Sequence, residues 1–181
     1  MRTSIVYCEN KSGVIKICSY LVEKDYKKIG MIRGPEYISR DACERFFAFK
    51  ASAKKLGFPL KNEFLYECPR FEEEAAYQTM TLWIKKGNLP RAIFCANDDL
   101  AYGAISALRD HKITVPADIA VVGYDDSKRS AMTNPTLTTM RQPLEAMGRA
   151  AIETLLQLIS KRVKTPIQLK FEPELVVRQS A

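Results

Sequence analysis

"AIFCANDDLAYGAISALRDH", residues 92–111, contains the strand, polar turn and helix from which the fold can be predicted. The four apolar residues 92–95 are typical of a fully buried strand, and residues 99–110 have the pattern of a helix. Asn97, Asp98 and Asp99 lie between the two. An amide and two carboxylates at this point either start the helix as capping residues or hold a ligand, and both interpretations stay open.

The same strand–helix alternation continues on both sides of this stretch. A helix is indicated between an N-cap at Ser39 or Asp41 and a stop at Gly57, and another over residues 71–87. Strands are indicated at 27–35, 62–68 and 119–123. The order β-α-β-α-β-α-β predicts an α/β fold with a mainly parallel sheet and helices on both faces.

The alternation changes after Asn134. "PTLTTMRQP" (135–143) predicts a short strand between prolines, and Pro143 is suited to the first position of a following helix. "IQLKFEPELVVRQ" (167–179) predicts one or two closing strands. The apolar stripe of the helix is expected to be its buried face: Leu144, Met147, Ala151, Leu155 and Leu158.

Composition narrows the class of protein. The chain has 181 residues, of which 46% are hydrophobic and 27% charged, as in an ordinary globular domain. No window approaches 18 consecutive apolar residues, and the N-terminal stretch is too polar for a signal peptide. The net charge is +7, but the basic residues occur as pairs at expected helix ends, where the helix dipole favours them. No membrane and no DNA-contacting patch on this chain are therefore predicted.

Cysteine and histidine usage limits the chemistry. Five cysteines without CxxC spacing, three of them in apolar runs, fit a reducing cytoplasm. The single histidine, His111, closes a helix pattern and argues against a histidine-rich metal site or a histidine-dependent nucleophile. A phosphate loop and an octahedral magnesium ligand set are also missing from the sequence. We expect no metal, no cofactor and no enzymatic activity.

Ligands of open parallel sheets bind outside the carboxyl ends of the strands, and four such ends are polar here: 33–35, 67–70, 97–99 and 124–126. Amide, carboxylate and aromatic groups along one edge suit polyhydroxyl or nucleobase ligands. Asp125 and Asp126 are individually explained by an Asx-turn. Two acidic strand ends on neighbouring units are harder to explain without a ligand, because like charges packed together cost stability.

The combination of "ANDDLAYGA", "VPADIAVVGYDD" and "PTLTTMRQP…MG" resembles the effector-binding core of lactose-repressor/galactose-repressor (LacI/GalR) regulators. The similarity extends to "DYKKIGMIRGP", "DACERFFAFKASAKKLG" and "PELVVRQS", and so covers essentially the whole chain. It implies a periplasmic-binding-protein-like type I fold of two α/β lobes. By this resemblance, residues 10–134 and 164–181 form the C-terminal lobe, and residues 1–9 and 135–163 form part of the N-terminal lobe.

The resemblance also implies the ligand-facing residues. Arg45, Asn97, Asp125 and Gln142 match its ligand-binding positions, and Phe71 matches the aromatic that covers a sugar or base ring. The Asp125 carboxylate can accept hydrogen bonds, the Arg45 guanidinium can donate several side by side, and the Asn97 amide can do both. By the same reasoning Asp98 caps the following helix and Asp126 orders its turn. The sequence departs from the family pattern at Glu9-Asn10 and Asp25-Tyr26, and by one extra residue before Arg45.

These features allow three functions. In the first, the chain senses a small effector, a sugar or nucleobase-like molecule, as part of a cytoplasmic homodimeric regulator. We then expect a helix-turn-helix that precedes this sequence, in an N-terminally longer protein, to contact the DNA. In the second, it is a binding protein for transport or chemoreception on the same fold. The third, an enzyme, fits poorly. The crossing segment "PTLTTMRQP…MG" and the end "PELVVRQS" favour the regulator.

Overall fold

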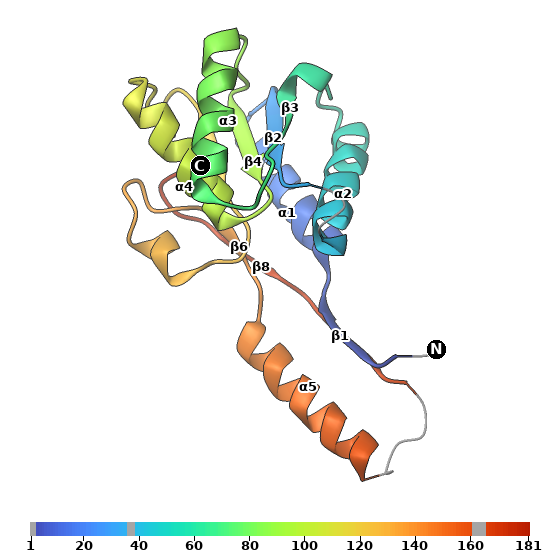
Figure 1. Cartoon of the computed structure of the whole chain (residues 1–181). Coiled ribbons are helices and arrows are strands. Elements are labelled where there is room, and N and C mark those ends of the chain that lie inside the picture. The colour runs from blue at the N-terminus through green and yellow to red at the C-terminus, as the bar shows by residue number, and fades with distance from the viewer. Residues whose placement is uncertain (1–2, 36–38, 161–165) are drawn as a thin grey trace.

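The computed structural model describes residues 3–35, 39–160 and 166–181. Its centre is a four-stranded, fully parallel sheet in the order β3-β2-β4-β5 (Figure 1). The strands are β2 (Ile29–Arg33), β3 (Leu65–Glu67), β4 (Ala92–Cys95) and β5 (Ala120–Val122). The predicted α/β class and parallel sheet are confirmed. The expected lobe boundary at residues 163 and 164 lies outside the described residues.

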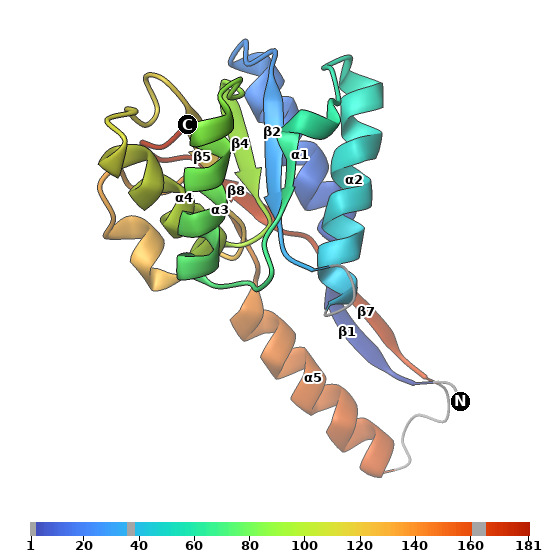
Figure 2. The same cartoon turned by 45° about the horizontal axis from the view of Figure 1, so that its top comes forward.

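Two helices cover each face of this sheet. α1 (Asn10–Glu23) packs beside α2 (Arg40–Leu56) on one face, and α3 (Glu73–Lys86) beside α4 (Asp98–Asp110) on the other (Figure 2). Because both faces are covered, the central strands β4 and β5 are apolar and buried at every position, whereas the edge strand β3 ends in the exposed Glu67. Short 3-10 turns, η1 (Asn62–Phe64) and η2 (Lys128–Ala131), lie in the connections.

Local sequence signals explain the limits of α2. The Ser39 side chain accepts a hydrogen bond from the Ala42 amide at 3.4 Å. Gly57 ends the helix in the left-handed region, with φ of 76°, where glycine has no steric cost. Both limits agree with the sequence prediction, since Ser39 was one of its two N-cap candidates.

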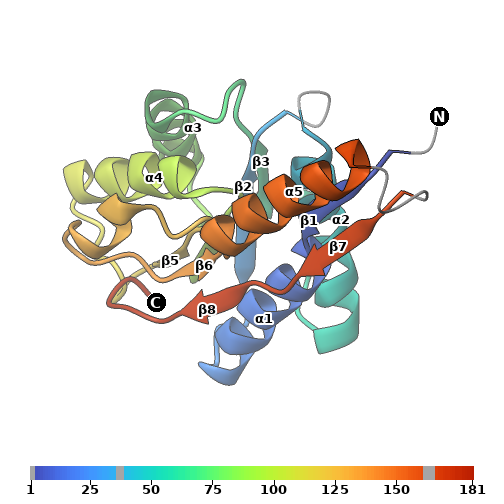
Figure 3. The same ribbon diagram turned by 90° about the horizontal axis from the view of Figure 1, so that it is seen from below.

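The remaining elements extend below the sheet. β6 (Thr139–Arg141) pairs antiparallel with β8 (Glu174–Val176), and β1 (Ile5–Cys8) pairs parallel with β7 (Gln168–Phe171). α5 (Leu144–Ile159) follows β6 and runs beside the β1–β7 ribbon (Figure 3). Three connections therefore pass between the main body and this smaller part: β1 to α1, β6 to α5, and β7 to β8.

The predicted buried face of α5 is wrong. Leu144 is 59% exposed and Leu155 56% exposed, while Thr154 is the residue of this helix that is buried. α5 lies away from the four-stranded sheet (Figure 1), and the strand that it contacts is β1. The apolar period predicts a helix and its apolar side correctly, but an amphipathic pattern carries no information on what covers that side. Pro143 also precedes the helix as its N-cap instead of opening it.

Among the described residues, no helix has both the length and the apolar character that are needed to span a membrane. In the described part of the chain none of the five cysteines forms a disulfide, and four of them are buried. Burial raises the pKa of the Cys18 thiol to about 12, so that this thiol is protonated at neutral pH.

Candidate ligand-binding site

The carboxyl edge of the parallel sheet, where α4 and the loop after β5 begin, brings several polar side chains together. Arg45 projects from the second turn of α2 and is 7% exposed. Its Nε donates to Asn10 Oδ1 at 2.8 Å, and its Nη1 donates to the Ala96 carbonyl oxygen at 2.6 Å. The guanidinium carbon lies 3.7 Å from the centre of the Tyr124 ring. Arg45 is thus a fixed, inward-facing donor and not a solvated residue on a helix edge.

Asp125 faces Arg45 from the loop after β5. Its Oδ1 lies 3.6 Å from Arg45 Nη1 and accepts a hydrogen bond of 2.7 Å from Gln142 Nε2. Burial raises the pKa of the Asp125 carboxyl to about 6, although Arg45 and Gln142 both lower it. Its φ of 120° is a conformation that side-chain-bearing residues rarely adopt. Such strain is a common property of functional loops.

Gln142 connects this loop to the smaller part of the molecule, because it lies between β6 and α5. The structure therefore brings together three of the predicted residues, Arg45, Asp125 and Gln142, although they lie up to 97 positions apart in the sequence. The three come from α2, the β5 loop and the β6–α5 connection. The hydrogen bond from Gln142 therefore joins the β6–α5 connection to the loop that carries Asp125.

The roles of Asn97 and Asp98 in the structure differ from the predicted ones. Asn97 is the N-cap of α4, and its side chain accepts a hydrogen bond of 3.0 Å from the Leu100 amide. Asp98, predicted as the cap, is instead 2% exposed and lies inside the first turn. The reason is positional: the cap must keep an extended backbone, and Asn97 does so with φ of −149°.

The buried Asp98 carboxylate accepts hydrogen bonds from three groups. They are the Ser127 amide at 2.8 Å, the Ser130 hydroxyl at 2.7 Å and the Thr139 hydroxyl at 2.5 Å. Burial raises the pKa of Asp98, while these three donors lower it. Asp98 thereby joins α4 to η2 and to β6, a role for which the sequence offered no signal beyond its place next to the cap.

Asp126 is a second structural anchor. Its side chain accepts from Arg141 Nε and from Arg178 Nη2, each at 2.6 Å. Burial raises the pKa of Asp126, but the bonds from both arginines outweigh it and lower the pKa overall. With φ of 54°, Asp126 occupies the turn that the sequence predicted it to order.

The fifth predicted residue is Phe71. Its ring packs against Gly34 at the end of β2, where a side chain larger than hydrogen would overlap the ring. Phe71 is not among the residues that line the cavity beside Arg45 and Gln142. Its predicted position over a ligand ring therefore stays a prediction.

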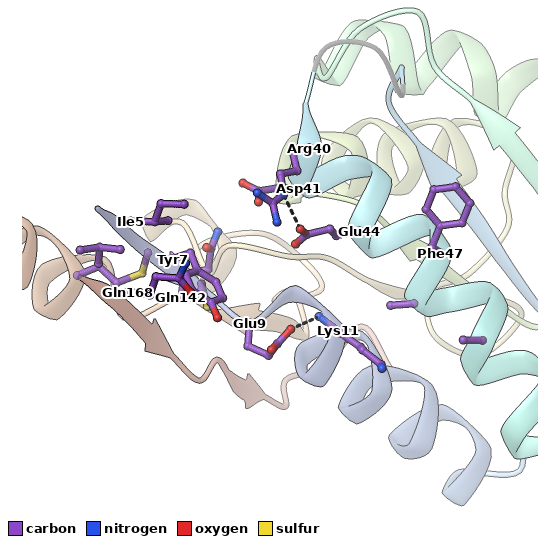
Figure 4. Close-up of a pocket in the computed structure, with 15 residues that line it drawn as sticks. Ile5, Tyr7, Glu9, Lys11, Arg40, Asp41, Glu44, Phe47, Gln142 and Gln168 are labelled. Carbon is purple, nitrogen blue, oxygen red and sulfur yellow. Dashed lines mark hydrogen bonds and ion pairs between the residues drawn. The ribbon is translucent and has the colours of Figure 1, made fainter. Parts of the chain in front are cut away.

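A cavity of about 890 Å³ opens between α2 and the crossing strands (Figure 4). Tyr7, Glu9 and Gln142 lie on one side of it, and Asp41, Glu44 and Phe47 project from α2 on the other. Of the five predicted residues, Gln142 is the one that lines this space. Its size falls in the range of cavities that hold small molecules.

Asn10 and Glu44 also build the site, although the sequence indicated no site role for either, and Asp41 was predicted only as a possible N-cap. Asn10, which is 2% exposed, donates from Nδ2 to Asp41 Oδ1 at 2.9 Å and to Glu44 Oε2 at 3.1 Å. It accepts from Arg45 at the same time. A continuous polar chain thus runs from Asp125 through Arg45 and Asn10 to the cavity wall. The departure at Glu9-Asn10 was the available signal, since it marks the first crossing between the two parts.

Within the described residues, no three His, Cys, Asp or Glu side chains are grouped so that they could hold a metal ion. The carboxyl edge of the parallel sheet offers hydrogen-bond donors and acceptors. Arg45 supplies donors, Asp125 acceptors, and Gln142 both. Such groups can form hydrogen bonds with oxygen- and nitrogen-bearing small molecules.

Known proteins match this chain at the level of the whole fold. The family model of the periplasmic binding protein-like domain matches residues 18–181. The HTH-type transcriptional repressor PurR of Actinobacillus pleuropneumoniae serotype 3 (strain JL03) is 36% identical over 164 residues, which are 89% of this chain and 48% of the repressor. The chain spans about half the length of the curated relatives that it matches.

Solved structures agree. The transcriptional regulator CelR in its cellobiose complex superposes with a TM-score of 0.93 at 28% identity, over 99% of this chain and 54% of that one. A dimeric Lac repressor with a C-terminal deletion superposes with a TM-score of 0.88 at 26% identity, over 95% of this chain and 62% of that one. The chain belongs to the periplasmic binding protein-like domain family, in the form found in LacI/GalR-type transcriptional regulators.

Proposed function

We propose that the chain is the effector-sensing part of a LacI/GalR-type transcriptional regulator. The observation that carries the proposal is the contact of Asp125 with both Arg45 and Gln142, because it joins the sheet edge to a connection between the two parts. A ligand held by these groups stabilises one arrangement of the two parts over another. Coupled to DNA-binding heads, such a two-state element makes operator binding depend on the ligand.

The same proposal assigns the partners. The ligand is a small metabolite, a sugar or a nucleobase-like molecule, and the site residues are Arg45, Asp125 and Gln142 with Asn97 and Phe71 near the same edge. DNA is contacted through a helix-turn-helix outside these 181 residues, in a homodimer. The relatives are repressors, which favours this function over transport and over an enzyme. Cysteines that are not paired in disulfides support a cytoplasmic location.

The molecule divides, in this proposal, into two lobes. Residues 10–134 with the C-terminal segment form one lobe, and residues 1–9 with 135–163 form part of the other. The pairing of β7 with β1 supports adding Gln168–Phe171 to the smaller part, so that the last crossing falls at Glu172 and Pro173. The exposed apolar side of α5 then belongs to the smaller lobe.

The test is a calorimetric titration of this chain with cellobiose, ribose and hypoxanthine, before and after Asp125→Ala. Loss of a charged hydrogen-bonding group costs roughly 1.5–3 kcal/mol, so the affinity for the bound compound should fall by about 10- to 100-fold. Glu23→Ala, at the exposed far end of α1, is the matched control and should bind like the wild type. Unchanged affinity in Asp125→Ala would contradict the assignment of the site.

A further inference from the structure

The helix ends that face the site carry an unusual amount of negative charge. α1, α2 and α4 begin near this edge, and a helix N-terminus normally attracts anions through its free amides and dipole. Here each is already occupied by a protein oxygen: Glu9 Oε1 accepts from the Lys11 amide at 3.3 Å, Ser39 caps α2 and Asn97 caps α4. Their first turns also hold carboxylates: Asp41 in α2, and Asp98 and Asp99 in α4.

Two of the cations near the cavity are already engaged with protein groups. Arg45 donates to Asn10 and Ala96, and Arg40 pairs with Glu44 at 2.8 Å. The Lys11 side chain extends along α1 and away from the carboxylates of α2 (Figure 4). An anionic ligand would therefore meet few free positive charges at this edge.

The cavity wall offers the carboxylate acceptors Asp41 and Glu44 beside its two cations, Lys11 and Arg40. Asn10 holds both Asp41 and Glu44 at this wall through its two Nδ2 hydrogens. In the described part of the chain, Asp125 uses Oδ1 for Gln142 and Arg45, which leaves Oδ2 for an incoming donor. A ligand rich in O–H and N–H groups satisfies these acceptors, whereas a phosphate brings more acceptors and more negative charge.

We infer that this site takes an uncharged, donor-rich ligand and rejects its phosphorylated form, with Asp41 and Glu44 as the residues that discriminate. The inference rests on the proposed function, because it names the class of ligand for the same site. Like charges without counter-ions repel, and the repulsion is strongest where water is excluded. The phosphorylated member of a ligand pair is expected to bind about tenfold or more weakly, which corresponds to about 1.4 kcal/mol.

The experiment titrates the chain with three matched pairs of probes at pH 7.5: glucose and glucose 6-phosphate, ribose and ribose 5-phosphate, inosine and inosine 5′-monophosphate. The double variant Asp41→Asn with Glu44→Gln keeps oxygens that can accept from Asn10 and removes two charges. Its discrimination between the members of a bound pair should shrink by at least about threefold. Glu23→Gln with Asp25→Asn removes two exposed charges at the far end of α1 and should discriminate like the wild type.

The outcomes separate the two proposals. Tighter binding of the uncharged probe, with the selection reduced in the Asp41/Glu44 double variant, supports the inference. Equal or tighter binding of the phosphorylated probe overturns the inference and leaves the sensor function in place. The same holds if the Asp41/Glu44 double variant discriminates between the two probes as strongly as the wild type does. If neither these probes nor cellobiose and hypoxanthine bind the wild type, the sensor function fails and the inference fails with it. Circular dichroism and melting temperatures establish that both double variants are folded.

Discussion

In the proposed site the Asp125 carboxylate is an acceptor for the ligand, and its burial lowers the stability of the fold at neutral pH. We expect Asp125→Asn to increase stability and to weaken ligand binding. Burial raises the pKa of Asp125 from the ordinary 3.8 to about 6, against the opposing effects of Arg45 and Gln142. The folded chain therefore binds this proton more tightly than the unfolded chain does. Stability from this group is fully present below about pH 4 and is lost as the pH rises to about 6.

The size of the effect follows from the same values. The difference between 3.8 and about 6 is roughly 2.2 pH units, and about 1.36 kcal/mol per unit sets a ceiling near 3 kcal/mol. The side chain is 35% exposed, so water screens part of this cost. We expect Asp125→Asn to raise the free energy of unfolding at pH 7 by about 1–2 kcal/mol. Asn still accepts the hydrogen bond from Gln142.

Urea denaturation of both proteins between pH 4 and pH 8 is the assay. The advantage of Asp125→Asn should be present at pH 7 and disappear toward pH 4, while the affinity for a ligand falls. Asp126→Asn is the control of opposite sign. The pKa of Asp126 is lowered by Arg141 and Arg178 despite its burial, so this variant should lose about 2 kcal/mol at pH 7. A wild type as stable as Asp125→Asn at pH 7, or a difference independent of pH, would refute the reasoning.

Three further predictions concern stability, each measured by urea denaturation. Asp98→Ala removes the acceptor of three hydrogen bonds, two of them from buried hydroxyl groups, and should cost about 3–5 kcal/mol; a loss below about 1 kcal/mol would contradict its role as an anchor. Gly103→Ala puts a methyl group against the Glu73 carbonyl of α3 and should cost about 1–3 kcal/mol; unchanged stability would mean that α3 and α4 can move apart without cost. Leu156→Asn, on the exposed side of α5, should change stability by less than about 0.5 kcal/mol; a larger loss would mean that this side is covered.

The main body could be predicted because its signals are local. The buried run at 92–95, the Ser39 cap and the Gly57 stop each act over one or two turns of chain, and all three appear at the predicted positions. Strand–helix alternation then determines a parallel sheet through the handedness of its crossovers. α5 shows the limit of such reasoning, because its apolar side is real but has no partner among the described residues.

The site could be predicted only in part, since it depends on contacts between distant residues. Arg45, Asp125 and Gln142 were identified from their matched motifs, and the structure brings them together. That Asn97 caps α4, and not Asp98, depends on one residue of helix register, which a sequence pattern does not resolve. Asn10 was missed as a site residue because its function is to connect other side chains.

The most direct test of the sensor assignment is a map of ligand-induced amide chemical-shift changes by NMR, using the probe that binds the chain most tightly. We predict the largest changes at Asp125, Gln142 and Asn97, with smaller changes around Arg45 and Asn10. A second hollow, lined by Ile105, Lys112 and other residues, lies outside this group and serves as the internal reference. Changes confined to that hollow, with Asp125 and Gln142 unaffected, would contradict the assignment.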